Sequence, residues 1–284
     1  MALFNLLVNL FGVALWSNWL SSRFDPLVKT SAASLAGTLK RARAAAPKRW
    51  PYLAGLAALL LARMWICLQL GSAFNWSPKL KFVFVVLSFR SEFADHMLVF
   101  SILSFAEMLA GFYLWLILLS FGDRSTLAEN PFTQFVQVQL KGLAKLPATV
   151  KLLFPLALGS LSWLALHPLL ARMAILPPAK SGPQLLAQAA VMGAGAYLAW
   201  KYLLLAVLVL HTLHSYIHFG EHPVWSFIEL SARNLLRPLR GLPLQFGRFD
   251  FLPLLGIAVM LLVAIATDHP PPHLRHLLFD WLPF

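Results

Sequence analysis

Long apolar segments alternate with shorter basic stretches along this 284-residue chain. About 20 consecutive apolar residues are needed to cross a hydrocarbon core of about 30 Å, so we expect each long segment to form a membrane-spanning helix. The predicted spans are residues 3–20, 51–71, 96–119, 152–173, 191–213 and 251–267. The pattern therefore predicts an all-α membrane protein with about six transmembrane helices.

Two stretches do not fit a single straight crossing. Residues 184–218 are too many for one straight crossing at about 1.5 Å per residue. We therefore expect either that the ends of the segment lie in the interface, or that the helix tilts or breaks near Gly193 and Gly195. Residues 82–87 are apolar but too few to cross, which predicts an interfacial or re-entrant segment.

Prolines divide the spans into three similar pairs. An Asp-, Asn- or His-Pro step follows the first span of each pair, and a second proline opens the next span, at Pro26 and Pro51, Pro131 and Pro155, and Pro223 and Pro253. The separations are 25, 24 and 30 residues. A unit that recurs at a similar spacing indicates internal repeats. We predict three helical hairpins, each with a basic amphipathic helix at the membrane interface between its spans.

The repeats give the expected boundaries along the chain. They are a first hairpin at 1–75, an interfacial or re-entrant connection at 76–94, a second hairpin at 95–175, a third at 184–268 and a C-terminal tail at 269–284.

Composition excludes a soluble globular protein, and charge orients the helices. Hydrophobic residues make up 59% of the chain and charged residues 12%. The net charge is +12, but the cations flank apolar segments, so we expect anionic lipid headgroups rather than nucleic acid as partners. The connections inside the hairpins hold 15 of the 23 cations. The positive-inside rule then places these basic loops in the cytoplasm and both termini outside an inner (cytoplasmic) membrane.

The last hairpin resembles the YggT (YlmG) family. The resemblance rests on ARNLLRPLRGLP at 232–243 and FDFLP at 249–253, and the middle hairpin shares NPFTQFV at 130–136. Family members usually carry two such stretches, so the N-terminal hairpin would be an addition. The resemblance implies a small multi-span protein of bacterial or plastid membranes. Members have been linked to osmotic-stress tolerance, division-site or nucleoid organisation, and haem attachment during cytochrome b6f assembly, and the resemblance transfers no catalytic residue.

The basic stretch 227–240 alternates apolar and cationic residues at helical spacing, which predicts an interfacial amphipathic helix. Arg237 and Arg240 lie three residues apart, so both guanidinium groups could meet one lipid phosphate. Together with Arg233 they are the candidate lipid-binding residues. The alternative is topological anchoring without lipid selectivity.

Three ionisable residues, Arg63, Glu107 and Lys201, fall near the middle of predicted spans. A charge at the bilayer centre costs at least about 2.5 kcal/mol, so each should find a partner or a hydrated cavity. Our favoured interpretation is charge pairing, in which Glu107 locks repeats together through Lys201 or an arginine. Snorkelling without a partner and an ion or proton path are the alternatives.

Four histidines, His211, His214, His218 and His222, recur at spacings that place them on one helical face. Such a stripe can bind metal or supply an axial haem ligand, and His211 and His214 are the candidate haem ligands because they lie deepest. Interfacial packing without a ligand is the favoured interpretation, so we expect no metal and no cofactor. The single cysteine, Cys67, excludes an internal disulfide and a four-cysteine metal site.

The sequence contains no Gly-rich phosphate loop, no Cys–His nucleophile pair and no convincing carboxylate dyad. We therefore expect a non-enzymatic membrane scaffold or assembly factor that binds anionic lipid and a membrane protein partner or a second copy of itself. Two alternatives stay open: a factor that handles haem or another cofactor, and an ion channel or transporter linked to osmotic stress.

Overall fold

A computed structural model describes most of the chain and shows an all-α membrane protein. The described residues are 2–21, 49–74, 76–82, 84–121, 131–217, 220, 222–237, 245–246 and 249–268. Several expectations lie outside them: the first basic connection with Pro26, the C-terminal tail, His218 and Arg240.

Apolar helices account for most of the described chain. They are α1 (Ala2–Ser21), α3 (Trp50–Phe74), α4 (Ala94–Leu119), α6 (Ala148–Arg172), α7 (Gly182–Gly195), α8 (Ala199–Tyr216) and α10 (Leu252–Asp268). Within the described residues, five helical segments are long and apolar enough to cross a membrane when α7 and α8 are taken as one 35-residue stretch. The last predicted span, α10, is a shorter apolar helix of 17 residues.

The chain divides into two compact units. One contains residues 1–82 and 86–110, and the other contains residues 83–85 and 111–284. The division does not follow the predicted hairpin boundaries, because α4 contributes its first turns to one unit and its last turns to the other.

In the first unit, α1 packs against α3, and Gly12 allows α1 to approach α4 closely. A Cβ at Gly12 would lie 2.7 Å from the Phe105 ring. The connection predicted to be interfacial or re-entrant contains two short strands, β1 (Lys79–Phe82) and β2 (Val85–Ser88), which form a two-stranded sheet. Its β-branched and aromatic residues favour extended backbone, and the run is too short for a stable helix.

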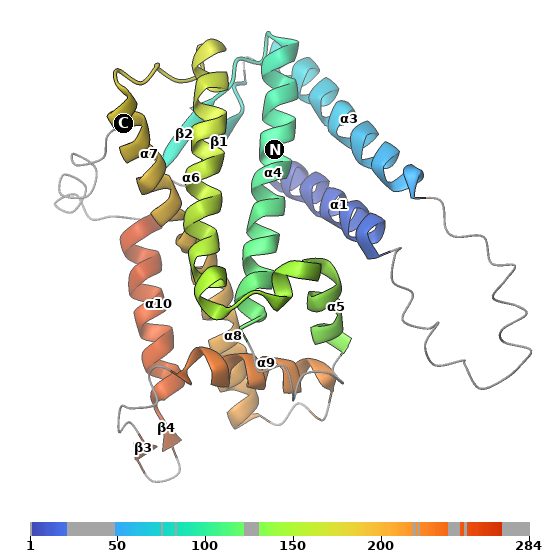
Figure 1. Ribbon diagram of the computed structural model, residues 1–284. Helices are drawn as coiled ribbons and strands as arrows, with labels where there is room; N and C mark the ends of the chain where they lie inside the picture. Colours follow the sequence, from blue (N-terminus) through green and yellow to red (C-terminus); the bar gives the residue numbers. More distant parts are fainter. Residues whose placement is uncertain are drawn as a thin grey trace, which may run out of the picture. The chain divides into compact units, whose positions relative to one another are not determined.

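The second unit is built around α6, α7, α8 and α10 (Figure 1). Helices α6 and α7 pack closely through glycines: a Cβ at Gly159 would lie 2.8 Å from the Gly193 Cα, and one at Gly193 only 2.2 Å from the Ser160 Oγ. Small residues at helix crossings are typical of membrane proteins, where close backbone approach replaces a hydrophobic driving force.

Of the alternatives given for the longest apolar segment, the structure shows an interruption of the α-helix beside Gly195. Helix α7 ends at Gly195, a 3₁₀ turn, η3 (Ala196–Leu198), follows, and α8 begins at Ala199. Two indole groups fix this point against α4: Trp115 Nε1 donates to the Ala199 carbonyl at 2.7 Å, and Trp200 Nε1 donates to the Leu114 carbonyl at 2.8 Å.

Two short helices lie between the long ones along the chain: α5 (Pro131–Leu140), which η2 (Lys141–Lys145) follows, and α9 (Pro223–Leu235). Figure 1 shows α9 lying across the direction of α6 and α10. The two short helices pack against each other, with the Phe132 and Phe227 rings 6.0 Å apart. Each begins at its predicted Asn-Pro or His-Pro step, where the missing proline N–H is not needed.

The second prolines behave differently from one another. Pro253 is the second residue of α10, as predicted, whereas Pro155 lies inside α6, which begins at Ala148 after Pro147. Membrane helices tolerate internal prolines because neighbouring helices satisfy the freed carbonyl groups. The strands β3 (Gln245–Phe246) and β4 (Phe249–Asp250) pair antiparallel between α9 and α10 in the chain.

Candidate functional site

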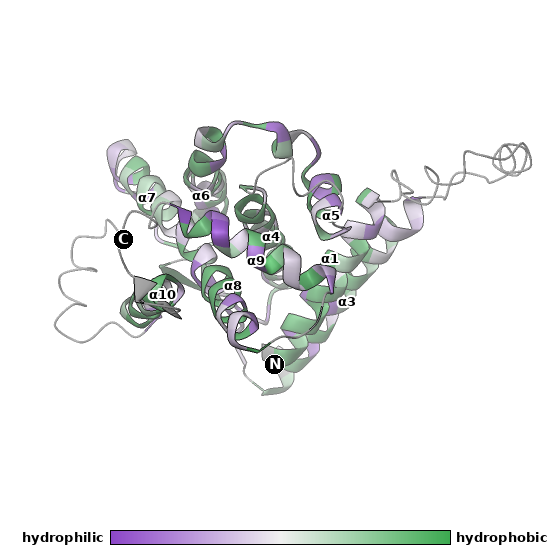
Figure 2. Ribbon diagram, turned by 90° about the horizontal axis from the view of Figure 1, so that it is seen from below, coloured by the Kyte–Doolittle hydropathy of each residue, from purple (hydrophilic) through white to green (hydrophobic). Residues whose placement is uncertain are grey.

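Helix α9 is amphipathic, as predicted from the sequence. Its first turn is capped by His222, whose Nδ1 accepts a hydrogen bond from the Val224 N–H at 3.3 Å. Ile228 and Ala232 lie on the buried face, and Ala232 packs in a cluster with Val207 and Leu208 of α8 and Leu252 of α10, whereas Arg233 is exposed. The helix ends at Leu235, just before the Arg-Pro step that cannot continue it. Figure 2 shows the resulting mixture of hydrophilic and hydrophobic residues along α9.

A cavity of about 380 Å³ opens between α8, α9 and α10. Its lining combines two imidazoles, a hydroxyl, an ion pair and two leucines: His211, His214, Ser215, Glu229, Arg233, Leu236 and Leu252. We call this cavity the α9 pocket. It brings together the lipid-binding candidate Arg233 and the haem candidates His211 and His214, which the sequence suggested separately.

Two contacts organise the α9 pocket. Arg233 Nη2 donates to Glu229 Oε1 at 2.5 Å across one helical turn. The arginine side chain is 60% exposed, so this pair adds little to stability, and its importance is that it places both signs of charge at the pocket. The His214 ring stacks on Trp225, with 5.0 Å between centroids and 8° between planes, which fixes the imidazole.

Sequence reasoning missed Glu229 and Ser215 as pocket residues. A signal for Glu229 was present, because it precedes Arg233 by four residues on a predicted helix, the spacing of a stabilising ion pair. The other lipid-binding candidates are less informative: Arg237 is exposed just beyond α9, and Arg240 lies outside the described residues.

The α9 pocket offers imidazoles but no complete metal site. Within the described part of the chain, no three His, Cys, Asp or Glu side chains are grouped to hold a metal ion. His211 and His214 are the residues that could hold a haem, while His222 serves as the helix cap.

The buried cation Arg63 has neutral partners. Its Nη1 donates to Asn9 Oδ1 and its Nη2 to Ser104 Oγ, both at 2.8 Å, and its Cζ lies 4.9 Å from the centre of the Phe100 ring. The side chain is 1% exposed. This cluster joins α1, α3 and α4, so the guanidinium is solvated by polar groups and an aromatic face rather than by a carboxylate.

Glu107 does not form the expected ion pair with Arg63. Glu107 is half-buried, and among the described residues of its unit it has neither a hydrogen bond nor an ion pair. The expectation that it pairs with an arginine is therefore wrong for Arg63, whose Nη atoms are taken by Asn9 and Ser104.

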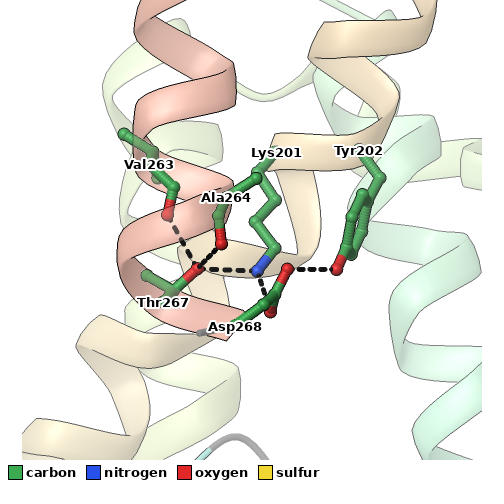
Figure 3. A network of polar contacts seen from close by, with 6 residues as sticks. All are labelled: Lys201, Tyr202, Val263, Ala264, Thr267 and Asp268. Atoms are coloured by element: carbon green, nitrogen blue, oxygen red, sulfur yellow. Dashed lines mark hydrogen bonds and ion pairs between the residues drawn. The ribbon is translucent and has the colours of Figure 1, made fainter. Parts of the chain in front are cut away.

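Lys201 pairs with Asp268 instead. Its Nζ lies 2.6 Å from Asp268 Oδ1 and 2.8 Å from Thr267 Oγ1, and the Tyr202 hydroxyl donates to Asp268 Oδ2 at 2.6 Å (Figure 3). The reason is that α10 runs antiparallel to α8, which brings its last residues beside the first turn of α8. The missed signal was Asp268, the acidic residue directly after the last predicted span.

A second cavity, of about 410 Å³, lies where α6 begins. It is lined by Ser120, Phe121 and the stretch from Lys145 to Ala148 together with Lys151. Lys151 is buried and donates to the Ser120 carbonyl at 3.0 Å. Two lysines thus line the second cavity, whereas the α9 pocket contains an arginine paired with a carboxylate.

Comparison with protein-family models, with curated proteins and with solved structures finds no match, so the assignment of the candidate site depends on the geometry of this chain.

Proposed function

We propose that this protein is a non-enzymatic membrane scaffold or assembly factor in which α9 lies at the membrane interface and binds anionic lipid headgroups. The observation that supports this proposal most is that α9 has a buried apolar face and an exposed cationic face. Ile228 and Ala232 are buried, with Ala232 packed in a cluster with residues of α8 and α10, while Arg233 and Arg237 are exposed. A helix held in this way presents cations at headgroup level without needing its own apolar face for insertion.

Exposed apolar side chains on the long helices give α9 a membrane context. On α6, Leu153 and Leu161 are 57% and 65% exposed, which in water would be an aggregation hazard but in lipid is the ordinary condition. The end of α9 overlaps the YggT-like stretch 232–243, which supports placing the protein in an inner membrane with its basic connections in the cytoplasm. A scaffold of this kind would engage a membrane protein partner or a second copy.

Lipid retention tests the proposal directly. Native mass spectrometry would compare wild type with a triple Arg→Gln variant at 233, 237 and 240, both released from nanodiscs containing phosphatidylglycerol and phosphatidylcholine. Each cation near an anionic surface contributes about 1 kcal/mol, so the triple variant should retain clearly less phosphatidylglycerol.

A matched variant controls for total charge. Lys79, Lys81 and Arg90 are exposed cations of the other unit, and changing all three to Gln removes the same charge. We expect this control to retain anionic lipid as wild type does. Equal retention by wild type and the 233/237/240 variant would overturn the proposal. A Soret absorption band that copurifies with wild type and disappears in His211→Ala would instead support cofactor handling.

A further inference from the structure

The α9 pocket is lined by both a cation and an anion, and each member of this ion pair has further atoms that can form hydrogen bonds. Arg233 and Glu229 use one atom each, Nη2 and Oε1, for their mutual contact. Among the described residues, the remaining guanidinium N–H groups and Glu229 Oε2 have no other partner. Both side chains stay accessible, at 60% and 38% exposure.

Inside the pocket, a purely anionic ligand would be repelled by the Glu229 carboxylate, and a purely cationic ligand would be repelled by the Arg233 guanidinium. A zwitterion avoids both conflicts, because its two charges can complete the ion pair from the pocket side. Side chains one helical turn apart have Cβ atoms about 5–6 Å from each other. In an ethanolamine headgroup two methylene groups separate the phosphate from the ammonium. The two charged groups of the headgroup can therefore reach two side chains that lie one helical turn apart.

We infer that the α9 pocket binds the headgroup of an aminophospholipid such as phosphatidylethanolamine. The ammonium lies against Glu229 Oε2, and the phosphate lies against the free guanidinium N–H groups of Arg233. The Ser215 hydroxyl on α8 also lines the pocket and can donate to a phosphate oxygen. A primary ammonium donates charge-assisted hydrogen bonds to a carboxylate, whereas the quaternary ammonium of phosphatidylcholine has no N–H to donate.

The apolar surroundings favour a lipid over a free zwitterion. Leu236 and Leu252 line the pocket itself. Next to the pocket residues in sequence, Leu210 and Leu213 on α8 are 37% and 43% exposed, and Leu254 on α10 is 40% exposed. These side chains provide a surface for acyl chains that a soluble headgroup would leave uncovered. The inference rests on the proposed function in one respect: α9 must lie at the level of the lipid headgroups.

The test is the ratio of phosphatidylethanolamine to phosphatidylcholine retained from nanodiscs that also contain phosphatidylglycerol. One charge-assisted hydrogen bond at a half-exposed site should make this ratio about threefold to tenfold in wild type. Glu229→Gln should bring it near one without lowering retention of phosphatidylglycerol. Glu229→Asp keeps the carboxylate and should keep part of the preference, which controls for folding. A ratio near one in wild type, or an unchanged ratio in Glu229→Gln, would overturn the inference.

Soluble glycerophosphoethanolamine, which carries the same zwitterionic phosphodiester, separates the two sources of this headgroup. At millimolar concentration it should leave retained phosphatidylethanolamine in place, because it lacks the acyl chains. Displacement of the lipid would show that the headgroup alone is the ligand and would overturn the lipid assignment. The phosphatidylethanolamine measurements can contradict the inference without contradicting the proposed function. The proposed function is tested separately, by phosphatidylglycerol retention in the triple arginine variant.

Discussion

Arg63 in one unit and Lys201 in the other are buried cations that are satisfied in opposite ways. Arg63 donates to two neutral oxygens, those of Asn9 and Ser104, at 2.8 Å. Lys201 lies 2.6 Å from a carboxylate, that of Asp268. Both side chains are less than one-tenth exposed, so burial does not distinguish them.

The difference lies in what remains when one group is removed. Asn9 Nδ2 already lies 3.1 Å from Ser104 Oγ, so these neutral groups can bond each other without the guanidinium. Removing Asp268, by contrast, leaves the buried Lys201 ammonium without its counter-charge, with the Thr267 hydroxyl as a neutral acceptor. Breaking a buried ion pair from one side is costly for this reason, whereas removing both charges often is not.

Asp268→Asn should have the largest effect on stability. It strands Lys201, and we expect the free energy of unfolding to fall by about 2–3 kcal/mol, below the full cost of a buried pair because Asp268 is 25% exposed. Denaturation by dodecyl sulfate in mixed micelles, followed by circular dichroism, would measure it. The double variant Lys201→Met/Asp268→Asn should return to within about 1 kcal/mol of wild type. A double variant no more stable than Asp268→Asn would contradict the pairing.

Arg63→Met should have a smaller effect, a loss of about 1 kcal/mol. The change removes two hydrogen bonds and a ring contact but leaves no stranded charge, and methionine fills much of the same volume. The same denaturation series measures it beside Asp268→Asn. If Arg63→Met proves the more destabilising of the two, the contrast drawn between neutral and charged partners is wrong.

Glu107→Gln should change stability least, by no more than about 0.5 kcal/mol, because Glu107 has no partner to lose among the described residues of its unit. The variant also addresses the transport alternative. In liposomes, wild type and Glu107→Gln should both show only background ion flux. Selective flux in wild type that Glu107→Gln abolishes would favour a channel or transporter over a scaffold.

Local pattern predicted the helices well. The first three expected spans end within a few residues of α1, α3 and α4, and the interruption after Gly195 was one of the alternatives that the length of the segment and its glycines suggested. Proline steps also placed the starts of α5 and α9. These features depend on neighbouring residues, which is the information that a single sequence carries.

Partnerships between distant residues were not predictable in the same way. Asn9, Arg63 and Ser104 come from three different helices, and nothing local says which helices will touch. The pairing of Lys201 with Asp268 depends on α10 packing antiparallel to α8. The α9 pocket likewise needs α8, α9 and α10 together, so its Glu229 was overlooked although its residue type and spacing were visible.

The central claim, that α9 lies at the level of lipid headgroups, is open to a direct depth measurement. Cys67, the only cysteine, would be removed by Cys67→Ala, and a spin label would be attached through Ser226→Cys on the exposed side of α9. Leu161→Cys on α6, where the leucine is 65% exposed, supplies a lipid reference, and free label supplies the aqueous one. Collision with oxygen and with a water-soluble nickel complex should give position 226 a depth between the two references. A value equal to that of the free label would contradict the claim.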